Sequence, residues 1–133
     1  MRRLSPALLT LLLGLAWWGC AKPDLPAPYS GLDTPEALLI SVEARDHGRE
    51  LFLEYCAICH GEKADGRGVR QMLSSPPTDF TDRAWKRRSA AAYIYYIIRE
   101  GKQGTAMPSW KVLDESETWD LVAYVLSVAD EAP

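Results

Sequence analysis

The stretch that decides the fold is Cys56-Ala57-Ile58-Cys59-His60, near the middle of a chain of 133 residues. Two thiols stand three positions apart, and a histidine directly follows the second thiol. At this C-x-x-C-H spacing, two thiols can add to the two vinyl groups of one haem while the adjacent histidine reaches the iron. We therefore predict that Cys56 and Cys59 attach one haem c covalently through thioether bonds. His60 is the predicted proximal axial ligand of the iron.

The N-terminus has the pattern of an export signal. Two arginines precede a leucine-rich run over residues 7–16, which is shorter than the span of about 20 residues that a membrane helix needs. Gly19 and Cys20 end this run in a way that resembles the lipobox of bacterial lipoproteins. We predict that residues 1–19 are a signal peptide and that Cys20 is lipidated. Removal of Cys20 by another peptidase, or retention of the segment as an anchor, are the alternatives.

Each of these alternatives places the rest of the chain outside the cytoplasm, in the periplasm or on the outer face of a bacterial membrane. Residues 20–40 contain four prolines and no apolar periodicity, which predicts a proline-rich tether to the membrane. A wrap packed against the folded domain is the alternative. The formal net charge of −3 argues against a nucleic-acid partner, because phosphate binding requires a basic face.

Two other uses of C-x-x-C compete with haem attachment. A thioredoxin-like redox pair follows a strand within a β-α-β unit, and the sequence shows no such unit. A structural zinc site needs more Cys or His ligands, but beyond Cys20 and the motif only His47 remains. His47 falls on a predicted helix and is interpreted as a surface residue. Export favours the haem, because thiol attachment of haem belongs to the same compartment.

The remaining sequence predicts an all-α domain over residues 41–133. Apolar residues recur at helical spacing over residues 41–56, with Ser41 as the N-cap. A second helix is predicted over residues 90–100, capped by Ser89 and ended by a glycine. A third follows Asp114, which forms a capping-box pattern with Glu117 and begins an apolar face made by Leu121, Val122, Val125, Leu126 and Ala129.

Residues 61–81 are predicted to form a long loop with a short helix around residues 70–73. A loop of that length is uncommon unless it wraps something, and so small a helical domain usually needs a further stabilising element. Both features favour a cofactor. The loop contains Pro76 and Pro77, either of which could supply a backbone carbonyl that orients His60.

A second iron ligand is predicted at Met107, within Gly104-Thr105-Ala106-Met107-Pro108. This loop lies between two predicted helices and can fold over the far face of a haem, and thioether sulfur is a soft iron ligand. The alternative is that Met107 fills a gap in the core, as methionine commonly does. Met72 is interpreted as a packing residue.

From about residue 45 to residue 128, the chain resembles a class I monohaem c-type cytochrome. The resemblance rests on the Cys56–His60 motif at the end of a helix, the proline pair, the Met107-Pro108 loop and a closing helix that carries aromatic residues. It implies a cytochrome c fold, with three to four helices wrapped around one covalently attached haem. In that family the first and last helices cross, and the residues at the equivalent places here are Gly48, Phe52, Leu121 and Tyr124.

The predicted function is electron transfer, because a six-coordinate haem leaves no position for a substrate. The expected partners are redox proteins and, through Cys20, a membrane, and the chain is not expected to be an enzyme. One alternative is a haem-bearing subunit of a larger oxidase or reductase complex. If Met107 is labile, a small-ligand sensor or a peroxidatic enzyme is another alternative.

Two further groups of residues have more than one interpretation. The basic residues dock an acidic partner, or neutralise haem propionates, or form a solvated face; they are Arg83, Lys86, Arg87, Arg88, Arg99 and Lys102. Most of the aromatic side chains in the second half are interpreted as core; they are Trp85, Tyr93, Tyr95, Tyr96, Trp110 and Trp119.

Overall fold

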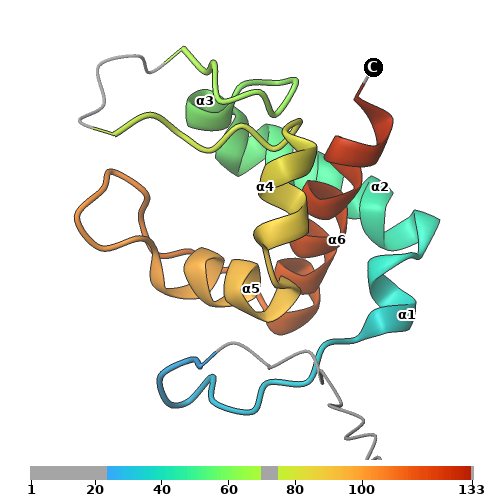
Figure 1. The fold of residues 1–133 in the computed structure, drawn as a ribbon, viewed down its shortest axis with the longest axis vertical. Helices are drawn as coiled ribbons and strands as arrows, with labels where there is room; N and C mark the ends of the chain where they lie inside the picture. The colour runs from blue at the N-terminus through green and yellow to red at the C-terminus, as the bar shows by residue number, and fades with distance from the viewer. Residues whose placement is uncertain (1–23, 70–74, 133) are drawn as a thin grey trace, which may run out of the picture.

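The computed structural model describes residues 24–69 and 75–132. Every regular element in these residues is a helix, which confirms the all-α prediction for this part of the chain (Figure 1). In chain order they are α1 (Glu36–Leu39), α2 (Val42–Leu51), the π-helical turn η1 (Phe52–Cys56), α3 (Ala57–His60), α4 (Arg83–Arg88), α5 (Ala91–Glu100) and α6 (Glu115–Glu131). The predicted signal peptide, Cys20, Met72 and the predicted helix around residues 70–73 lie outside the described residues.

The core is organised around the crossing of α2 and α6, which form the most extensive helix–helix contact of the fold. Gly48 lies at the crossing point, where an added Cβ atom would come within 2.0 Å of the Asp120 carbonyl oxygen. Only hydrogen fits there, so the two backbones approach closely. One turn later, the buried Phe52 ring lies 5.1 Å from the Tyr124 ring between centroids. The predicted contact between the first and last helices is therefore confirmed.

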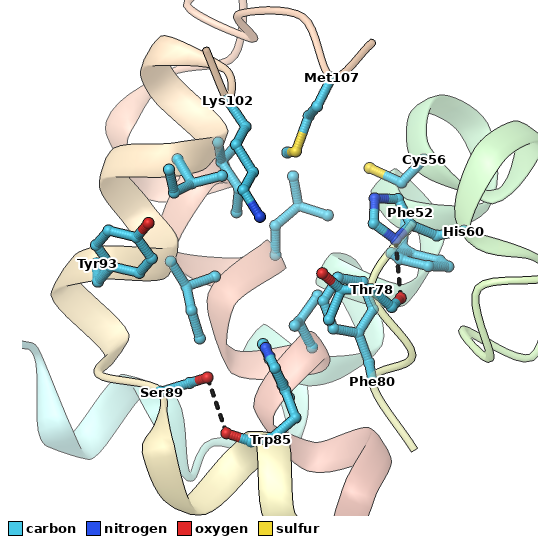
Figure 2. Close-up of a pocket in the computed structure, with 15 residues that line it drawn as sticks. Phe52, Cys56, His60, Thr78, Phe80, Trp85, Ser89, Tyr93, Lys102 and Met107 are labelled. Carbon is cyan, nitrogen blue, oxygen red and sulfur yellow. Dashed lines mark hydrogen bonds between the residues drawn. The ribbon is translucent and has the colours of Figure 1, made fainter. Parts of the chain in front are cut away.

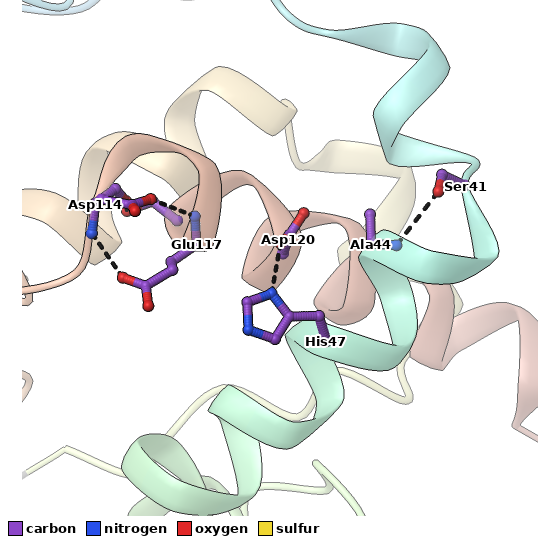
Figure 3. Close-up of polar contacts among 7 residues, drawn as sticks. Ser41, Ala44, His47, Asp114, Glu117 and Asp120 are labelled. Carbon is purple, nitrogen blue, oxygen red and sulfur yellow. Dashed lines mark hydrogen bonds and ion pairs between the residues drawn. The ribbon is translucent and has the colours of Figure 1, made fainter.

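The ends of the long helices are fixed by local hydrogen bonds (Figure 3). The Ser41 side chain accepts from the Ala44 backbone amide at 3.3 Å and caps α2. At α6, Asp114 and Glu117 each accept from the other's backbone amide at 2.8 Å, which forms the predicted capping box. These bonds satisfy amides that a helix leaves free at its N-terminus, so the two helices begin where the sequence predicts.

The predicted cap of α5 is wrong. The N-cap position of α5 is Ala90, which has no side-chain cap, and Ser89 instead donates its hydroxyl to the Trp85 carbonyl at 2.9 Å. Ser89 ends α4, a short helix that the sequence analysis did not predict and that lies directly before α5. Because helix C-termini leave carbonyls without partners, the hydroxyl serves the preceding helix rather than the following one.

The first predicted helix extends beyond its predicted end at residue 56. It runs from α2 through η1 to α3 and so ends at His60, with the Ala57 amide bonded to the Phe52 carbonyl inside the π turn. Gly61 then takes a positive φ of 80° and turns the chain away. The Cys56–His60 motif therefore lies in the last turns of a continuous helical segment, and the other end of this segment packs against α6.

The described part of the predicted tether, residues 24–40, packs against the domain. Leu25, Tyr29 and Leu39 are buried in the hydrophobic core, and α1 contacts α6. Figure 1 shows this segment, in blue to cyan, running beneath α5 before it reaches α1. Burial of apolar side chains favours this arrangement, so the wrap alternative describes these residues better than a free tether. We refer to residues 24–40 as the strap.

His47 lies at the surface, as predicted, but it also has a partner on α6. Its Nδ1 atom lies 2.8 Å from an Asp120 carboxylate oxygen, across the crossing of α2 and α6 (Figure 3). The Asp120 side chain is only 11% exposed, whereas that of His47 is 48% exposed. The hydrogen bond raises the His47 pKa, with smaller contributions from the charges of Asp120, Glu50 and Glu117, while burial acts the other way. Because a buried carboxylate needs a partner, the imidazole serves Asp120.

Across the described residues, no helix has the length and apolarity that a membrane crossing requires.

Candidate cofactor site

The four residues predicted to hold the cofactor line one cavity. The cavity has a volume of about 370 Å³, and its walls include Cys56, Cys59, His60 and Met107. A second cavity of about 120 Å³ adjoins it and shares Cys56, His60 and Met107 as lining residues. The larger volume lies within the range of about 300–1,000 Å³ that is common for cofactor sites. The fold therefore brings together residues that lie up to 51 positions apart in the sequence.

His60 is held with one ring nitrogen directed away from its backbone contact. Its Nδ1 atom donates to the Thr78 carbonyl at 3.2 Å, since a carbonyl can only accept (Figure 2). This bond fixes the tautomer and leaves the Nε2 lone pair free to bind a metal. Burial lowers the His60 pKa, which the Thr78 contact only partly opposes, so the imidazole is neutral at pH 7.

The carbonyl that orients His60 belongs to neither Pro76 nor Pro77, so that prediction is wrong by one residue. Pro76 and Pro77 line the larger cavity, and the chain turns toward the imidazole only at Thr78. A proline pair fixes the local backbone direction but not the residue at which a long loop meets a distant side chain. The prediction therefore identified the correct part of the loop but not the residue whose carbonyl binds His60.

A second feature of the same loop is the stacking of Phe80 on His60. The two ring centroids lie 4.7 Å apart with an interplanar angle of 19°. The Phe80 amide donates to the Ala64 carbonyl at 2.9 Å, which returns the end of the loop to its beginning. Sequence reasoning missed this residue, although Phe80 is the only aromatic residue in the predicted loop 61–81 and so carried a usable signal. Its ring restricts rotation of the imidazole.

Cys56 and Cys59 are free thiols in the structure, both half-buried. Burial, and to a smaller extent the charge of Cys59, raises the pKa of Cys56 to about 12. Gly68 donates its amide to the Cys59 carbonyl at 3.1 Å, and a Cβ atom on Gly68 would lie 2.5 Å from that carbonyl oxygen. The loop is thus packed directly against the backbone of the motif, which sets the direction of the two thiols relative to the cavity.

Met107 reaches the cavity from the loop that follows α5. Figure 2 shows its sulfur directed into the space that Cys56 and His60 face from the other side. The loop is closed by the Lys102 amide, which donates to the Met107 carbonyl at 3.2 Å, and by the Thr105 hydroxyl, which accepts from the Met107 amide at 3.2 Å. Gly101 has a φ of 78°, and a Cβ atom there would lie 2.8 Å from the Met107 carbonyl oxygen.

The walls of the smaller cavity are mainly apolar. Its lining includes Ile94, Ile97, Ile98, Leu121 and Val125 from the facing sides of α5 and α6. Apolar walls suit a flat hydrophobic ring system and keep water from a bound metal. Around the two adjoining cavities lie a nitrogen donor, a thioether donor and two free thiols, which is the set that a covalently attached haem requires. The residues present therefore fit haem c.

The basic residues have separate roles. Arg83 donates to the carbonyls of Ala129 and Ala132 at the end of α6, and Lys86 pairs with Asp130. The Lys102 side chain points into the cavity (Figure 2), whereas Arg87 and Arg88 are exposed. Arg99 donates to the Leu113 carbonyl. Four of the six basic residues therefore have structural contacts or face the cavity, and neither a docking face nor a solvated face describes the whole group.

The aromatic residues are mostly core, as predicted. Tyr95 is 3% exposed and its ring centroid lies 4.4 Å from that of Trp119. Tyr96, Trp85, Trp110 and Trp119 are half-buried and pack against the core. Tyr93 is the exception, since it is 45% exposed at the edge of the smaller cavity.

The chain is similar to several known proteins. A thiosulfate dehydrogenase of Stutzerimonas stutzeri (strain A1501) is 28% identical over 115 residues, which cover 82% of this chain and 32% of that protein. The cbb3-type cytochrome c oxidase subunit CcoP of Azospirillum brasilense is 33% identical over 84 residues, which cover 62% of this chain and 28% of that protein. The chain thus spans about a third of the length of these relatives.

A solved structure shares the fold. It is a chain of the reducing HAO-like protein complex of Kuenenia stuttgartiensis, which superposes with a TM-score of 0.54 at 25% sequence identity over 63% of this chain and 41% of that chain. Residues 43–125 match the family described as cytochrome c oxidase, cbb3-type, subunit III. This span includes the motif and Met107 and leaves out the strap. The chain therefore belongs to this family and is a c-type cytochrome, an electron-transfer protein that binds haem c covalently.

Proposed function

We propose that this chain carries one electron at a time on a single haem c, with the iron held by His60 Nε2 and Met107 Sδ and the ring attached through Cys56 and Cys59. The observation that carries the proposal is that an oriented neutral imidazole and a thioether, which belong to separate elements, line the same cavity. The haem supplies the one-electron redox couple, and a histidine–methionine pair raises its potential.

The chain's own residues set the conditions for that transfer. The Thr78 carbonyl holds the donor side of His60, which makes the other nitrogen a better ligand. Phe80 covers the imidazole, and the isoleucine face of α5 keeps water from the space between the two ligands. If His60 and Met107 both bind the iron, no ligand position is left for a substrate, so we propose that the chain carries electrons and does not convert a substrate itself.

Removal of the thioether tests the ligand assignment. Met107→Ala, made in a cell that attaches haem c, is expected to keep the covalent haem but to lower its reduction potential and to bind carbon monoxide when reduced. Met72→Ala is the matched control, since Met72 is interpreted as a packing residue, and it is expected to leave both properties unchanged. An unaltered potential in Met107→Ala would refute Met107 as a ligand.

A second candidate is an electron-transfer subunit of a stable oxidase or reductase complex. It is favoured by the comparisons, since one relative is named as an oxidase subunit and the matching structure belongs to a protein complex. Tagged protein isolated from its native membranes at high salt tests it. Stoichiometric co-purification of other subunits would favour the complex, whereas recovery of the chain alone would favour a shuttle whose docking is weak and salt-sensitive.

Absence of an enzymatic activity of its own is also testable. One relative is named a thiosulfate dehydrogenase, but this chain covers only 32% of that protein. The purified oxidised chain is expected to take electrons from a small chemical reductant and to stay oxidised when mixed with thiosulfate alone. Reduction by thiosulfate without another protein would contradict the proposal that the chain only carries electrons.

We further propose that the chain is exported and held at the outer face of a bacterial membrane by lipid on Cys20. The export-type N-terminus and the extracytoplasmic chemistry of haem c attachment support this proposal. Cys20→Ser is expected to move the protein from the membrane fraction to the soluble exported fraction. Retention of the variant in the membrane would contradict lipid as the sole attachment.

A further inference from the structure

The strap has a buried contact with the helix that leads into the Met107 loop. Tyr29, which is 8% exposed, lies with its ring centroid 5.2 Å from that of Tyr96 and 6.2 Å from that of Tyr95. Both partners belong to α5. The strap lies outside the family match at residues 43–125, so this contact is an addition to the domain that the family shares.

The Tyr29 hydroxyl donates to the Glu100 carboxylate, which also binds Lys111 beyond the Met107 loop. It donates to one Glu100 oxygen at 2.5 Å, and the Lys111 ammonium donates to the other Glu100 oxygen at 2.7 Å. Glu100 is the last residue of α5, and Lys111 lies four residues after Met107. The two donors lower the Glu100 pKa, with Lys111 the larger contributor, so the carboxylate is charged at pH 7. One charged group therefore joins the strap to the far end of the loop.

The same end of α5 receives the loop at two other points. The Ser109 hydroxyl donates to the Arg99 carbonyl at 2.6 Å, and the Trp110 amide donates to the Ile98 carbonyl at 3.0 Å. With Gly101 packed against the Met107 carbonyl, the loop leaves α5 and returns to it within about ten residues. The position of the Met107 sulfur thus depends on contacts at the C-terminus of α5, where Glu100 lies.

We propose that Tyr29 is a positioning residue for Met107, and that the strap, through Glu100 and Lys111, holds the loop closed so that the thioether stays on the haem iron. The proposal rests on the proposed ligation by Met107. It makes the segment that leads to the predicted membrane anchor part of the control of the iron's sixth ligand. Among the described residues, loss of the Tyr29 hydroxyl leaves Lys111 as the remaining hydrogen-bond partner of Glu100 and loosens the base of the loop without removing any residue of the cavity.

The test is competition for the iron by imidazole. In the purified ferric holoprotein, imidazole binds only when Met107 has left the iron, so its apparent affinity reports how often the loop opens. Tyr29→Phe keeps the ring contacts and removes only the hydroxyl. Since a hydrogen bond to a charged group contributes more than a neutral one, the variant is expected to bind imidazole roughly tenfold more tightly. The weak far-red absorption band of a sulfur-bound ferric haem is expected to diminish in parallel.

Tyr96→Phe is the matched control. Tyr96 lies on the same helix and contacts the same ring, but within residues 24–69 and 75–132 its hydroxyl makes no hydrogen bond. It is expected to bind imidazole as the wild type does. Glu100→Ala is expected to weaken sulfur ligation by itself and to abolish any further effect of Tyr29→Phe, because the two substitutions act through the same link.

Two results would overturn the inference, and they are distinguishable. If the wild type shows the far-red band and Tyr29→Phe changes only the melting temperature, with imidazole affinity unaltered, the strap is merely structural and the proposed function stands. If the wild type lacks the band and binds imidazole without competition, Met107 is not a ligand, and both proposals fail together.

Discussion

The two sides of the cavity are held by different kinds of interaction. On the His60 side, the ligand ends a helical segment that is fixed by the close approach of Gly48 to α6 and by packing of the Phe52 and Phe80 rings. On the Met107 side, the ligand lies in a loop that is held by a glycine turn and by hydrogen bonds to the end of α5. The His60 side depends mainly on apolar burial, and the Met107 side depends mainly on polar contacts near the surface.

This difference indicates which ligand moves first. Buried close packing is lost only when helices separate, whereas partly exposed hydrogen bonds open individually and at small cost. We therefore expect substitutions on the His60 side to change global stability, and substitutions on the Met107 side to change ligand exchange at the iron while the fold persists.

The largest expected effect follows from the crossing of α2 and α6. Gly48→Ala places a methyl group where the Asp120 carbonyl lies, so the helices must separate. We expect a loss of about 3 kcal/mol in the free energy of unfolding, although alanine at an exposed helix position would be favourable by about 1 kcal/mol. Chemical denaturation of the holoprotein measures it.

The control for this substitution is Asp46→Ala, at an exposed position on the same helix. Its effect is expected to lie within about 0.5 kcal/mol. An equal loss in both variants would show that α2 tolerates neither change and would remove the close approach as the cause. A stable Gly48→Ala protein would show that the crossing does not depend on the glycine.

A smaller effect, confined to the Met107 side, is expected from Gly101→Ala. The new Cβ atom meets the Met107 carbonyl, and the backbone of Gly101, with φ 78° and ψ −177°, favours glycine. We expect a loss of about 2 kcal/mol and a clear loss of the sulfur-to-iron absorption band. Absorption spectra of the ferric protein and thermal unfolding measure the two effects.

Gly104→Ala is a closely matched comparison within the same loop. Gly104 has a φ of 77°, yet no atom lies within 4 Å of a Cβ added there. Gly104→Ala is expected to lower the free energy of unfolding by only about 1 kcal/mol, the cost of a positive φ at alanine, and to keep the sulfur-to-iron absorption band. If both variants lose the band equally, backbone conformation rather than contact with Met107 positions the loop.

The smallest expected effect is pH-dependent and belongs to the His60 side. The Asp120 hydrogen bond raises the folded-state pKa of His47 above its ordinary value of 6.5. The stabilisation is therefore complete below pH 6.5 and is lost as the pH rises through the folded-state pKa. Because the His47 side chain is 48% exposed, we expect the contribution to be no more than about 0.5 kcal/mol.

The difference in unfolding free energy between the wild type and His47→Gln measures this contribution. The difference is expected to be complete at about pH 5 and to shrink as the pH rises through the folded-state pKa of His47. A difference that grows with pH would reverse the sign of the linkage and contradict the raised pKa.

The helical side of the molecule was predictable from the sequence because its signals are local. Ser41, Asp114 and Glu117 are caps that act over three or four residues, and Gly48 and Phe52 have a helical spacing. The Cys56–His60 motif predicted haem c for the same reason, because its spacing is local. Such features depend on backbone geometry within one or two helical turns, so they can be recognised without knowing how the rest of the chain folds.

Contacts made by loops were not predictable in the same way. The carbonyl that orients His60 comes from Thr78 rather than from Pro76 or Pro77, since the loop meets the imidazole 18 residues along the chain. The strap was predicted to be a tether because it is rich in prolines and has no apolar periodicity. Its buried side chains Leu25 and Tyr29 therefore gave no recognisable signal. Tyr29 finds Glu100 across 71 residues, a pairing that no local pattern indicates.

We expect His60 and Met107 together to occupy both axial ligand positions of the haem iron. The most direct measurement is the visible spectrum of the reduced protein, produced with a haem-attachment system and recorded before and after addition of carbon monoxide. We expect a low-spin c-type spectrum that the gas leaves unchanged. A prompt shift of the spectrum would contradict it, because carbon monoxide would then have found an open or easily displaced ligand position at the iron.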